Sequence, residues 1–349
     1  MRIRSARLLP YRLPLRTAWQ TSHGRFTERR GWLVRLETDC GAVGWGDCAP
    51  LPEAGTESAD EAKKWLHAIL PRLAKTDPGN APLDDAPPAT RCALQTASLD
   101  LCARAAGASL AHFLTPAAAK RVTVAGNAGA LASATAHRLG ALVAAGYRVI
   151  KVKVGVREPG RELELLRTVA SVLPAGIELR LDANQAWGEA QAHAFVAGLR
   201  DLPIESLEEP LRRPKCAALA SLQAEVPFPL ALDESLAGTA QALSFREPPV
   251  SRLILKPMVL GGPLRALHIA QRARSAGMEC VVTTTVDSAV GTWAAAHLAA
   301  AVDGDAGGPA HGLATGEWLS ADVGLAPRAV DGTLQLSEAP GLGVTPEAD

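Results

Sequence analysis

Residues 149–184 read VIKVKVGVREPGRELELLRTVASVLPAGIELRLDAN, and this stretch decides the fold class. An apolar run at 149–154 is followed by a segment of helical spacing at 161–171 and by a second apolar run at 178–181. Short apolar runs that alternate with amphipathic helices are typical of strand–helix–strand units in a parallel sheet. The stretch therefore predicts an α/β protein whose strands are connected by helices.

The same unit recurs from residue 121 onward at intervals of about 25 residues. The apolar runs are 122–125, 149–154, 178–181, 205–207, 229–232, 252–255, 279–283 and 310–314. Eight strands separated by helices predict a closed parallel (β/α) barrel. A doubly wound open sheet is the alternative, but no Gly-x-Gly-x-x-Gly turn lies between a first strand and helix, as such sheets often require.

The flanking residues predict a second, smaller unit. Strand-like alternation at 2–11, 31–38 and 42–46 indicates a hairpin with a third strand. Ser58, with Glu61 three residues on, is expected to cap a helix, and a second helical pattern spans 89–106. Residues 320–349 look like a strand-and-loop tail that packs elsewhere. We expect an N-terminal α+β unit at 1–115, the barrel at 116–320 and a C-terminal segment at 321–349.

Composition excludes several classes of protein. The 349 residues include 36 basic and 36 acidic side chains, and only 4% are aromatic. Nucleic-acid-binding proteins carry a basic excess or aromatic stacking surfaces, and anionic membranes also attract basic surfaces. The chain begins without a signal-peptide apolar core, and its six cysteines form no Cys-x-x-Cys pair. We expect a soluble, cytoplasmic protein with no nucleic-acid or membrane partner.

The predicted strands end in charged residues at a similar point of each unit. These residues are Lys151, Lys153, Asp182, Glu208, Asp233 and Lys256. In parallel barrels the chemistry lies at the C-terminal ends of the strands. Any one of these residues alone would be interpreted as a helix cap or a solvated strand end. Five such features, at spacings of 29, 26, 25 and 23 residues from Lys153 onward, instead indicate an active site.

Lys151 and Lys153 are two residues apart in a strand, so they point to the same face. If that face is the barrel interior, the two ammonium groups lower each other's pKa, and partial burial lowers it further. A lysine with a lowered pKa is a base near neutral pH. The pattern therefore predicts that this strand supplies a base.

Asp182, Glu208 and Asp233 end three neighbouring strands and are expected to converge. Three close carboxylates need a cation to stay ionised, and oxygen ligands favour Mg²⁺ or Mn²⁺ over Zn²⁺. Lys153 and Lys256 then lie on opposite sides of the metal. A small-molecule carboxylate bound there would lose its α-proton to a lysine, and the divalent ion would stabilise the resulting enediolate.

The sequence resembles the enolase superfamily, in the branch with muconate cycloisomerase, over nearly its whole length. The motifs are Lys151-Val-Lys153, Asp182-Ala-Asn184, Glu208-Glu-Pro210, Asp233-Glu-Ser235 and Lys256, with Gly44-Trp-Gly-Asp47 and Gly341-Leu-Gly-Val344 near the two ends. The resemblance implies a (β/α)7β modified TIM barrel with an α+β capping domain, and two cap loops, about 16–30 and 47–55, that close the site. Asn184, two residues past Asp182, is expected to support the metal ligands.

Two patterns resemble the o-succinylbenzoate synthases of that branch. One is the predicted seventh-strand end, where small hydroxyl groups would bind a succinyl carboxylate; its residues are Thr283, Thr284, Thr285, Asp287 and Ser288. The other is His-Gly-Leu-Ala-Thr-Gly around Gly312. The resemblance implies Mg²⁺-dependent syn dehydration of 2-succinyl-6-hydroxy-2,4-cyclohexadiene-1-carboxylate to 2-succinylbenzoate, in menaquinone biosynthesis, with Lys153 as base and Lys256 as a stabilising cation.

Four other interpretations stay open at this point. An N-succinylamino acid racemase or dipeptide epimerase would use Lys153 and Lys256 as acid and base, and a muconate-type cycloisomerase shares the same strand ends. A Schiff-base aldolase would use a barrel lysine without a metal, and a non-catalytic binding protein would need none of these groups. The sequence also leaves open whether the chain forms a homo-oligomer.

Overall fold

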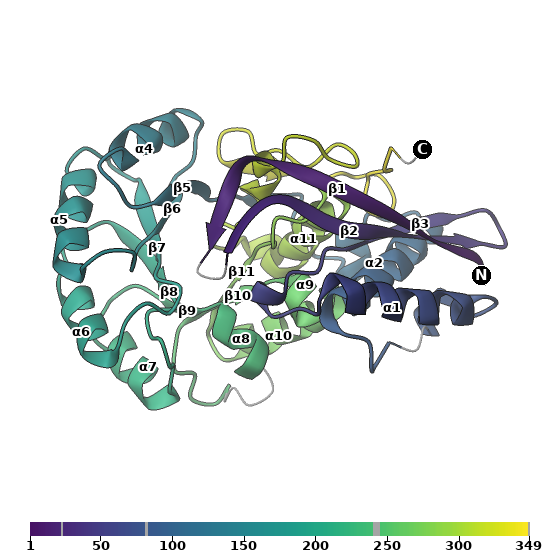
Figure 1. Ribbon diagram of the computed structural model, residues 1–349, viewed down its shortest axis with the longest axis horizontal. Coiled ribbons are helices and arrows are strands. Elements are labelled where there is room, and N and C mark those ends of the chain that lie inside the picture. The colour runs from purple at the N-terminus through teal and green to yellow at the C-terminus, as the bar shows by residue number, and fades with distance from the viewer. Residues whose placement is uncertain (22–23, 81–82, 240–244, 348–349) are drawn as a thin grey trace.

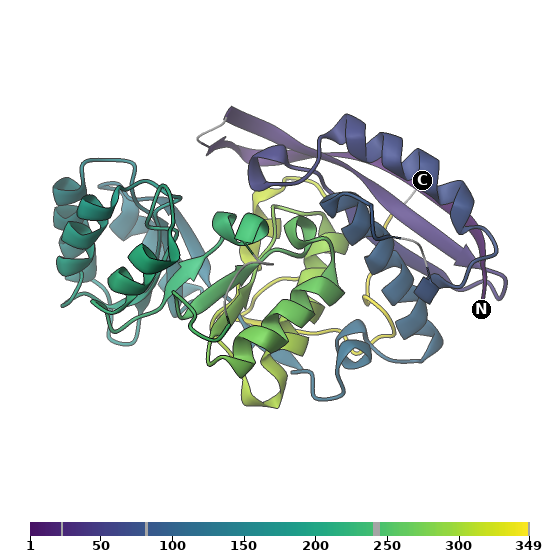
Figure 2. The ribbon, with the colours of Figure 1, turned by 90° about the horizontal axis from the view of Figure 1, so that it is seen from below.

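The structure is a computed structural model that describes residues 1–21, 24–80, 83–239 and 245–347. Its central element is a seven-stranded parallel sheet whose strands follow one another in chain order. The strands are β5 (Gly126–Ala130), β6 (Val149–Lys153), β7 (Glu178–Asp182), β8 (Ile204–Glu208), β9 (Leu230–Leu232), β10 (Arg252–Leu255) and β11 (Glu279–Val282). The sheet curls, and helices cover its outer face (Figures 1 and 2), so the predicted α/β barrel is confirmed.

The helices follow from the alternation seen in the sequence. They are α4 (Thr135–Ala144), α5 (Pro159–Ala170), α6 (Glu189–Ala197), α7 (Cys216–Gln223), α8 (Glu234–Thr239), α9 (Pro257–Leu260), α10 (Pro263–Ser275) and α11 (Ala289–Asp303). In β6, Ile150 and Val152 are fully buried and belong to the core between sheet and helices. Burying such a side chain stabilises the fold by about 1.5–3 kcal/mol. The alternate residues, Lys151 and Lys153, are thereby turned to the barrel interior.

The eighth predicted strand, 310–314, is not a regular strand. His311 forms an isolated parallel bridge with Val124, and Gly312 forms one with Thr283. The His311 imidazole also accepts a hydrogen bond from the main-chain N–H of Val282, 2.9 Å away, and pairs with Asp303 Oδ1 at 3.0 Å. Two bridges and one side chain therefore fill the position where a full ladder was expected.

The prediction that 122–125 forms the first strand of the barrel is also wrong. Residues Arg121–Thr123 form β4, which pairs antiparallel with β12 (Thr333–Gln335) in the C-terminal segment. The first barrel strand is instead β5, which begins at Gly126 and has the sequence GNAGA. Glycine and alanine have low strand propensity, so the sequence pattern did not mark this segment as a strand.

The N-terminal part forms an antiparallel sheet of β1 (Ile3–Thr21), β2 (Gly24–Thr38) and β3 (Val43–Cys48), covered by α1 (Ala59–Ile69) and α2 (Pro88–Ala105). Ser58 caps α1, because its side chain accepts a hydrogen bond from the N–H of Glu61 at 3.2 Å. Gly46 lets α2 approach β3 closely, since a Cβ there would lie 1.9 Å from the carbonyl oxygen of Ala93. Both the hairpin and the capped helix agree with the prediction.

The expected cap loop at 16–30 is instead the far end of the β1–β2 hairpin. The antiparallel pairing continues to Thr21 and Gly24, and in the view of Figure 1 this end of the hairpin lies over the middle of the barrel. Leu15 forms a bridge with Leu319, and the N–H of Ser320 donates to the carbonyl of Pro14 at 2.8 Å. The side chains of 19–25 lie outside the described residues.

The C-terminal segment returns to the N-terminal sheet. Asp100, fully buried in α2, accepts hydrogen bonds from the N–H of Leu342 at 2.8 Å and from the N–H of Trp45 at 2.9 Å.

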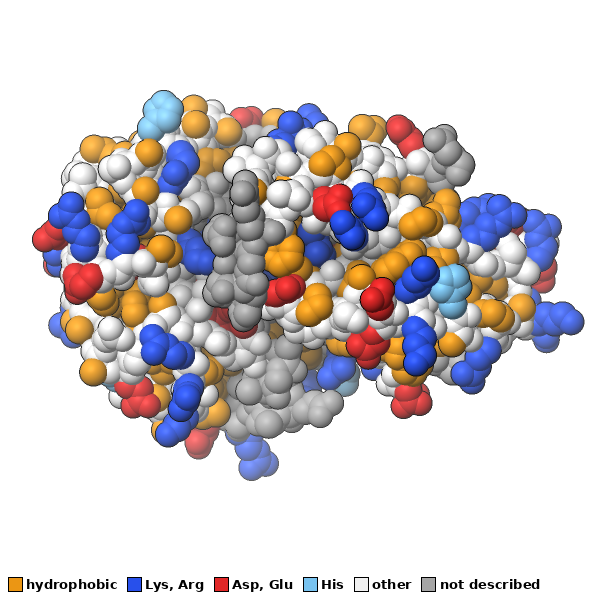
Figure 3. Space-filling model, in the orientation of Figure 1, with side chains coloured by type: hydrophobic (Ala, Val, Ile, Leu, Met, Phe, Trp, Pro, Cys, Tyr) orange, Lys and Arg blue, Asp and Glu red, His pale blue; other side chains and the backbone are white. Residues whose placement is uncertain are grey.

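Acidic and basic side chains are interspersed on the face shown in Figure 3. Within the described ranges, no helix is both long enough and apolar enough to cross a bilayer.

Candidate active site

The strand register brings the predicted site residues to one rim of the barrel. Lys153 lies opposite Asp182 in the β6–β7 pairing, and Asp182 lies opposite Glu208 in the β7–β8 pairing. Asp233 directly follows β9, and Lys256 directly follows β10. The five residues therefore gather at the C-terminal ends of consecutive strands, which is where barrels of this kind carry their chemistry.

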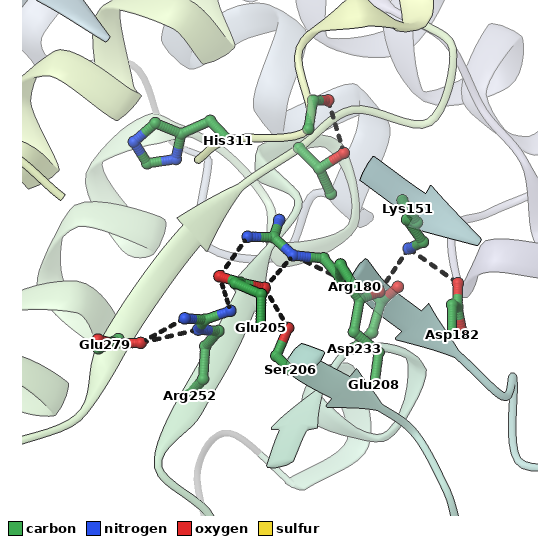
Figure 4. Close-up of polar contacts among 12 residues, drawn as sticks. Lys151, Arg180, Asp182, Glu205, Ser206, Glu208, Asp233, Arg252, Glu279 and His311 are labelled. Carbon is green, nitrogen blue, oxygen red and sulfur yellow. Dashed lines mark hydrogen bonds and ion pairs between the residues drawn. The ribbon is translucent and has the colours of Figure 1, made fainter. Parts of the chain in front are cut away.

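The Lys151 ammonium group bridges two of the carboxylates. Its Nζ is 2.8 Å from Asp182 Oδ2, and it also contacts Glu208 Oε2 (Figure 4). Burial acts to lower the pKa of Lys151, but the charges of Asp182, Glu208 and Asp233 outweigh burial and raise this pKa well above its ordinary value. The prediction of a lowered pKa for Lys151 is wrong, because carboxylates rather than an ammonium group dominate its surroundings.

The carboxylates compete for this positive charge. Burial raises the pKa of Asp182, but Lys151 more than compensates and holds it below its usual range. Burial also raises the pKa of Glu208, and the neighbouring charge of Asp182 contributes to a net rise despite Lys151. The pKa values of these two adjacent buried carboxylates are thus shifted in opposite directions. A further positive charge beside them would favour the ionised form of both.

Lys256 and Lys153 differ in their partners. Lys256 Nζ is 2.7 Å from Asp233 Oδ1 and 2.8 Å from Oδ2. Burial acts to lower the pKa of Lys256, but Asp233 and Glu234 raise it above its ordinary value. Within the described ranges, no carboxylate lies at ion-pair distance from Lys153, which has a half-buried side chain. Of the three rim lysines, Lys153 is thus the one without a fixed counter-charge.

The three carboxylates fit a divalent cation by their donor chemistry. In the described part of the chain, no three acidic, histidine or cysteine side chains already surround one point as metal ligands. The Lys151 ammonium group lies between Asp182 and Glu208, and that of Lys256 lies against Asp233. An all-oxygen donor set of Asp182, Glu208 and Asp233 suits Mg²⁺ or Mn²⁺.

Asn184 joins two of the strand ends, and its expected role in supporting metal ligands stays a prediction. Its N–H donates to Asp182 Oδ1 at 3.0 Å, and its Nδ2 donates to Glu234 Oε1 at 2.7 Å. Burial and the neighbouring Asp233 raise the pKa of Glu234 to about 8. The amide therefore fixes the turn after β7 against the residue that follows Asp233.

A charged layer below the rim was missed in the sequence. Arg180 donates from Nε and Nη2 to both oxygens of Glu205, each at 2.9 Å, and its Nε lies 3.9 Å from Glu208 Oε1 (Figure 4). Arg252 joins Glu205 to Glu279. Burial raises the pKa of Glu205, but the two arginines lower it to about 2. The position of Arg180, two residues before Asp182, was a usable signal. Glu205 lies at a register shift that no sequence pattern reveals.

The residues predicted to bind substrate lie after β11, and their hydroxyl groups have partners within the chain. Thr283 Oγ1 donates to the carbonyl of Gly312 at 2.8 Å, and the hydroxyls of Thr284 and Thr315 are 2.5 Å apart. Thr285 donates from its N–H and Oγ1 to Asp287 Oδ1 at 3.2 and 2.6 Å. Thr283 and Gly312 are half-buried, whereas Thr284, Thr285, Asp287 and Ser288 are buried. Their role in substrate binding stays a prediction.

Asp47 connects the N-terminal sheet to this loop. Its Oδ2 accepts hydrogen bonds from the N–H and Oγ of Ser288 at 3.0 and 2.8 Å, and its Oδ1 accepts one from the Tyr11 hydroxyl at 2.7 Å. Arg29 donates to the carbonyls of Ala49 and Val286 beside it. Burial, together with the charge of Asp287, raises the pKa of Asp47 to about 7.

We expect Asp47→Asn to change how stability depends on pH. A folded-state pKa of about 7, against an ordinary value of 3.8, means that the folded protein holds this proton more tightly. The stability from Asp47 is therefore complete below pH 3.8 and is lost as the pH rises towards 7. In urea unfolding between pH 4 and 8, the variant should gain on wild type by up to about 1.4 kcal/mol per pH unit inside this window. A difference that does not vary with pH would contradict the shift.

Comparison with known proteins identifies the family. Residues 134–349 match the model described as enolase C-terminal domain-like, and residues 3–100 match that of the MenC N-terminal domain. The o-succinylbenzoate synthase of Pectobacterium atrosepticum is 31% identical over 306 residues, which cover 85% of this chain and 86% of that protein. Chloromuconate cycloisomerase CbnB of Cupriavidus necator is 30% identical over 307 residues, which cover 83% and 81%.

The fold agrees with these matches. A crystal structure of muconate lactonizing enzyme from Pseudomonas fluorescens, complexed with muconolactone, superimposes with a TM-score of 0.87 at 25% identity, covering 99% of this chain and 97% of that one. The family model spans more than half of the chain, and it is joined by relatives that match at 30% identity or more over most of their length. The chain therefore belongs to the enolase superfamily, in the branch of the muconate lactonizing enzymes, and is similar to the o-succinylbenzoate synthases of that branch.

Proposed function

We propose that the chain is an o-succinylbenzoate synthase. It would dehydrate 2-succinyl-6-hydroxy-2,4-cyclohexadiene-1-carboxylate to 2-succinylbenzoate, with Mg²⁺ held by Asp182, Glu208 and Asp233. Relatives that carry this name match most of the chain at 31% and 32% identity, and the MenC N-terminal model matches residues 3–100. The site supports a reaction in which one lysine moves protons and the other stays charged.

The observation that carries this proposal is the unequal pairing of the rim lysines. Lys256 is held by the Asp233 carboxylate at 2.7 Å and has a raised pKa, so it keeps its proton. Lys153 has no carboxylate partner among the described side chains, so it is the rim lysine that we propose moves the protons. Dehydration on one face of the ring needs a single acid–base group, which this asymmetry provides.

The residues would then act in the following order. Lys153 removes the α-proton next to the substrate carboxylate, and electron density moves onto the carboxylate oxygens. Lys256, on the far side of the carboxylate strands, stabilises the negative charge with its ammonium group. Lys153, now protonated, donates its proton to the departing hydroxide, which leaves as water from the same face. The bound divalent ion would act as a Lewis acid on the developing negative charge.

The loop after β11 is proposed to bind the succinyl arm of the substrate. Thr283 and Gly312 are the half-buried members of this group, so they are the ones placed to touch a ligand. Gly312 lets Thr283 approach the main chain closely, because a Cβ on it would lie 2.4 Å from Thr283 Oγ1. Thr285, Asp287 and Ser288 would hold the shape of the loop, since their polar groups already bond one another or Asp47.

A substrate panel tests the proposal directly. Purified protein with Mg²⁺ is given the cyclohexadiene carboxylate, and loss of the diene absorbance is followed in the ultraviolet. N-succinylamino acids and dipeptides are incubated in parallel in deuterated buffer and examined by NMR for exchange at the α-carbon. We expect dehydration to be the fastest reaction by kcat/KM. Fast exchange with inversion, and no loss of the diene, would overturn the assignment.

A second candidate, racemisation or epimerisation of an N-acylated amino acid, is favoured by one observation. Lys153 is the last residue of β6, and Lys256 directly follows β10. The two ammonium groups therefore flank the carboxylates at the ends of β7, β8 and β9 from opposite sides. Two-base proton transfer requires such an arrangement. The panel separates the two functions, because only racemisation exchanges the α-proton without consuming a diene.

A further inference from the structure

Glu209 directly follows the proposed metal ligand Glu208, but it binds main chain rather than the other carboxylates. Its side chain is almost fully buried. Its Oε1 accepts hydrogen bonds from the N–H of Asp233 at 2.7 Å and from the N–H of Ser235 at 2.8 Å. Oε1 of Glu209 thus holds the backbone at Asp233, a proposed metal ligand, and again at Ser235, two residues later.

The second oxygen extends this grip to a third strand end. Glu209 Oε2 accepts hydrogen bonds from Ser235 Oγ at 2.7 Å and from Gln185 Nε2 at 3.3 Å. The N–H of Gln185 in turn donates to the carbonyl of Glu209 at 2.7 Å. The ends of β7, β8 and β9, where Asp182, Glu208 and Asp233 lie, are therefore connected through one side chain.

Asp233 needs such support because its strand is short. Strand β9 spans Leu230–Leu232 and has two paired positions with each neighbour, so Asp233 lies beyond the regular ladder. The backbone at Glu209 has a φ of 42°, a left-handed value that non-glycine residues rarely adopt. Uncommon backbone geometry persists where surrounding contacts hold it, and it is enriched at functional sites.

We propose that Glu209 is a positioning residue that fixes Asp233, and with it the affinity of the site for a divalent cation. This inference rests on the proposed metal-dependent function. Groups that orient metal ligands typically change metal affinity by about 10–100-fold when they are removed. Glu209 acts through the main-chain N–H of Asp233 and needs no contact with the metal or the substrate.

The test measures metal binding without substrate. Mg²⁺ binding is followed by calorimetry and Mn²⁺ binding by electron paramagnetic resonance, for wild type, Glu209→Ala, Glu209→Asp and Glu209→Gln. We expect Glu209→Ala to weaken both affinities by about 10–100-fold. Glu209→Asp, one methylene shorter, should weaken them by at least about fivefold. Glu209→Gln keeps one acceptor oxygen for the two N–H groups and should stay within about threefold of wild type.

A control separates positioning from a general loss of structure. Glu164→Ala removes an exposed carboxylate on α5 and should bind metal within about threefold of wild type. Far-ultraviolet circular dichroism verifies that each variant is folded, and Glu209→Asp decides the question if Glu209→Ala does not fold.

The outcomes are distinguishable from failure of the proposed function. Folded Glu209→Ala, or folded Glu209→Asp in its place, with metal affinity within threefold of wild type would overturn the positioning role. Wild type that binds the ions but fails to dehydrate the diene overturns only the proposed substrate. Wild type that binds neither ion overturns both.

Discussion

Lys153→Ala is expected to lower kcat for dehydration by about 10³- to 10⁴-fold, the upper range for loss of a general acid–base group. Lys153 stands level with Asp182 at the rim and has no carboxylate partner among the described residues. Its amine would therefore both take the α-proton and return a proton to the leaving group, so its removal stops two steps. The measurement is the loss of diene absorbance under saturating Mg²⁺, together with calorimetric titration of the metal.

Two variants give this prediction its control. Lys153→Arg keeps the positive charge but holds its proton at any working pH, so it should be nearly as inactive as the alanine variant. Lys120→Ala removes an exposed lysine that pairs loosely with Glu338, and it should leave kcat unchanged. Substantial dehydration by Lys153→Arg would show that charge rather than proton transfer is required at this position.

Removal of divalent metal by a chelator should abolish the dehydration, and added Mg²⁺ or Mn²⁺ should restore it. Glu208→Gln should be almost inactive for the same reason, because one of the three negatively charged ligands becomes a neutral amide. Developing negative charge on a substrate carboxylate is stabilised by several kcal/mol in such sites when a metal acts as a Lewis acid. Activity is measured before chelation, after chelation and after readdition of each ion.

The chelated protein is nevertheless expected to stay folded. Lys151 and Lys256 lie against Asp182, Glu208 and Asp233, so the buried carboxylates keep positive partners when metal is removed. Circular dichroism should therefore be unchanged while activity is lost. Full activity in protein shown by atomic absorption to contain no divalent metal would contradict the proposed mechanism.

The rim of the site could be predicted because its signals are local and periodic. Each strand is a short apolar run, each run ends in a charged residue, and a two-residue period decides which side chains face inward. Lys153, Asp182 and Glu208 accordingly occupy neighbouring register positions in the structure. The sequence also placed the Ser58 cap, because capping depends on residues three positions apart.

What the sequence did not reveal depends on contacts between distant residues or on backbone geometry. His311 replaces part of an expected ladder with its side chain, and no periodicity indicates that exchange. Glu209 acts through a positive φ and through bonds to a neighbouring strand. The pKa of Lys151 was predicted from its sequence neighbour Lys153, whereas carboxylates at the ends of three other strands determine it.

The hydrogen bonds between Asp47 and Ser288 have a consequence for how the chain folds during its synthesis. These two residues are 241 positions apart, and the bond between Asp100 and Leu342 spans 242. A ribosome synthesises the N-terminal part first, but Ser288 and Leu342, which donate to its buried carboxylates Asp47 and Asp100, emerge only with the last quarter of the chain. Contacts of such long separation form slowly, and domains often begin to fold during synthesis. The part that is translated first is therefore among the last to reach its final packing. Its apolar inner face is covered only after the barrel has been synthesised.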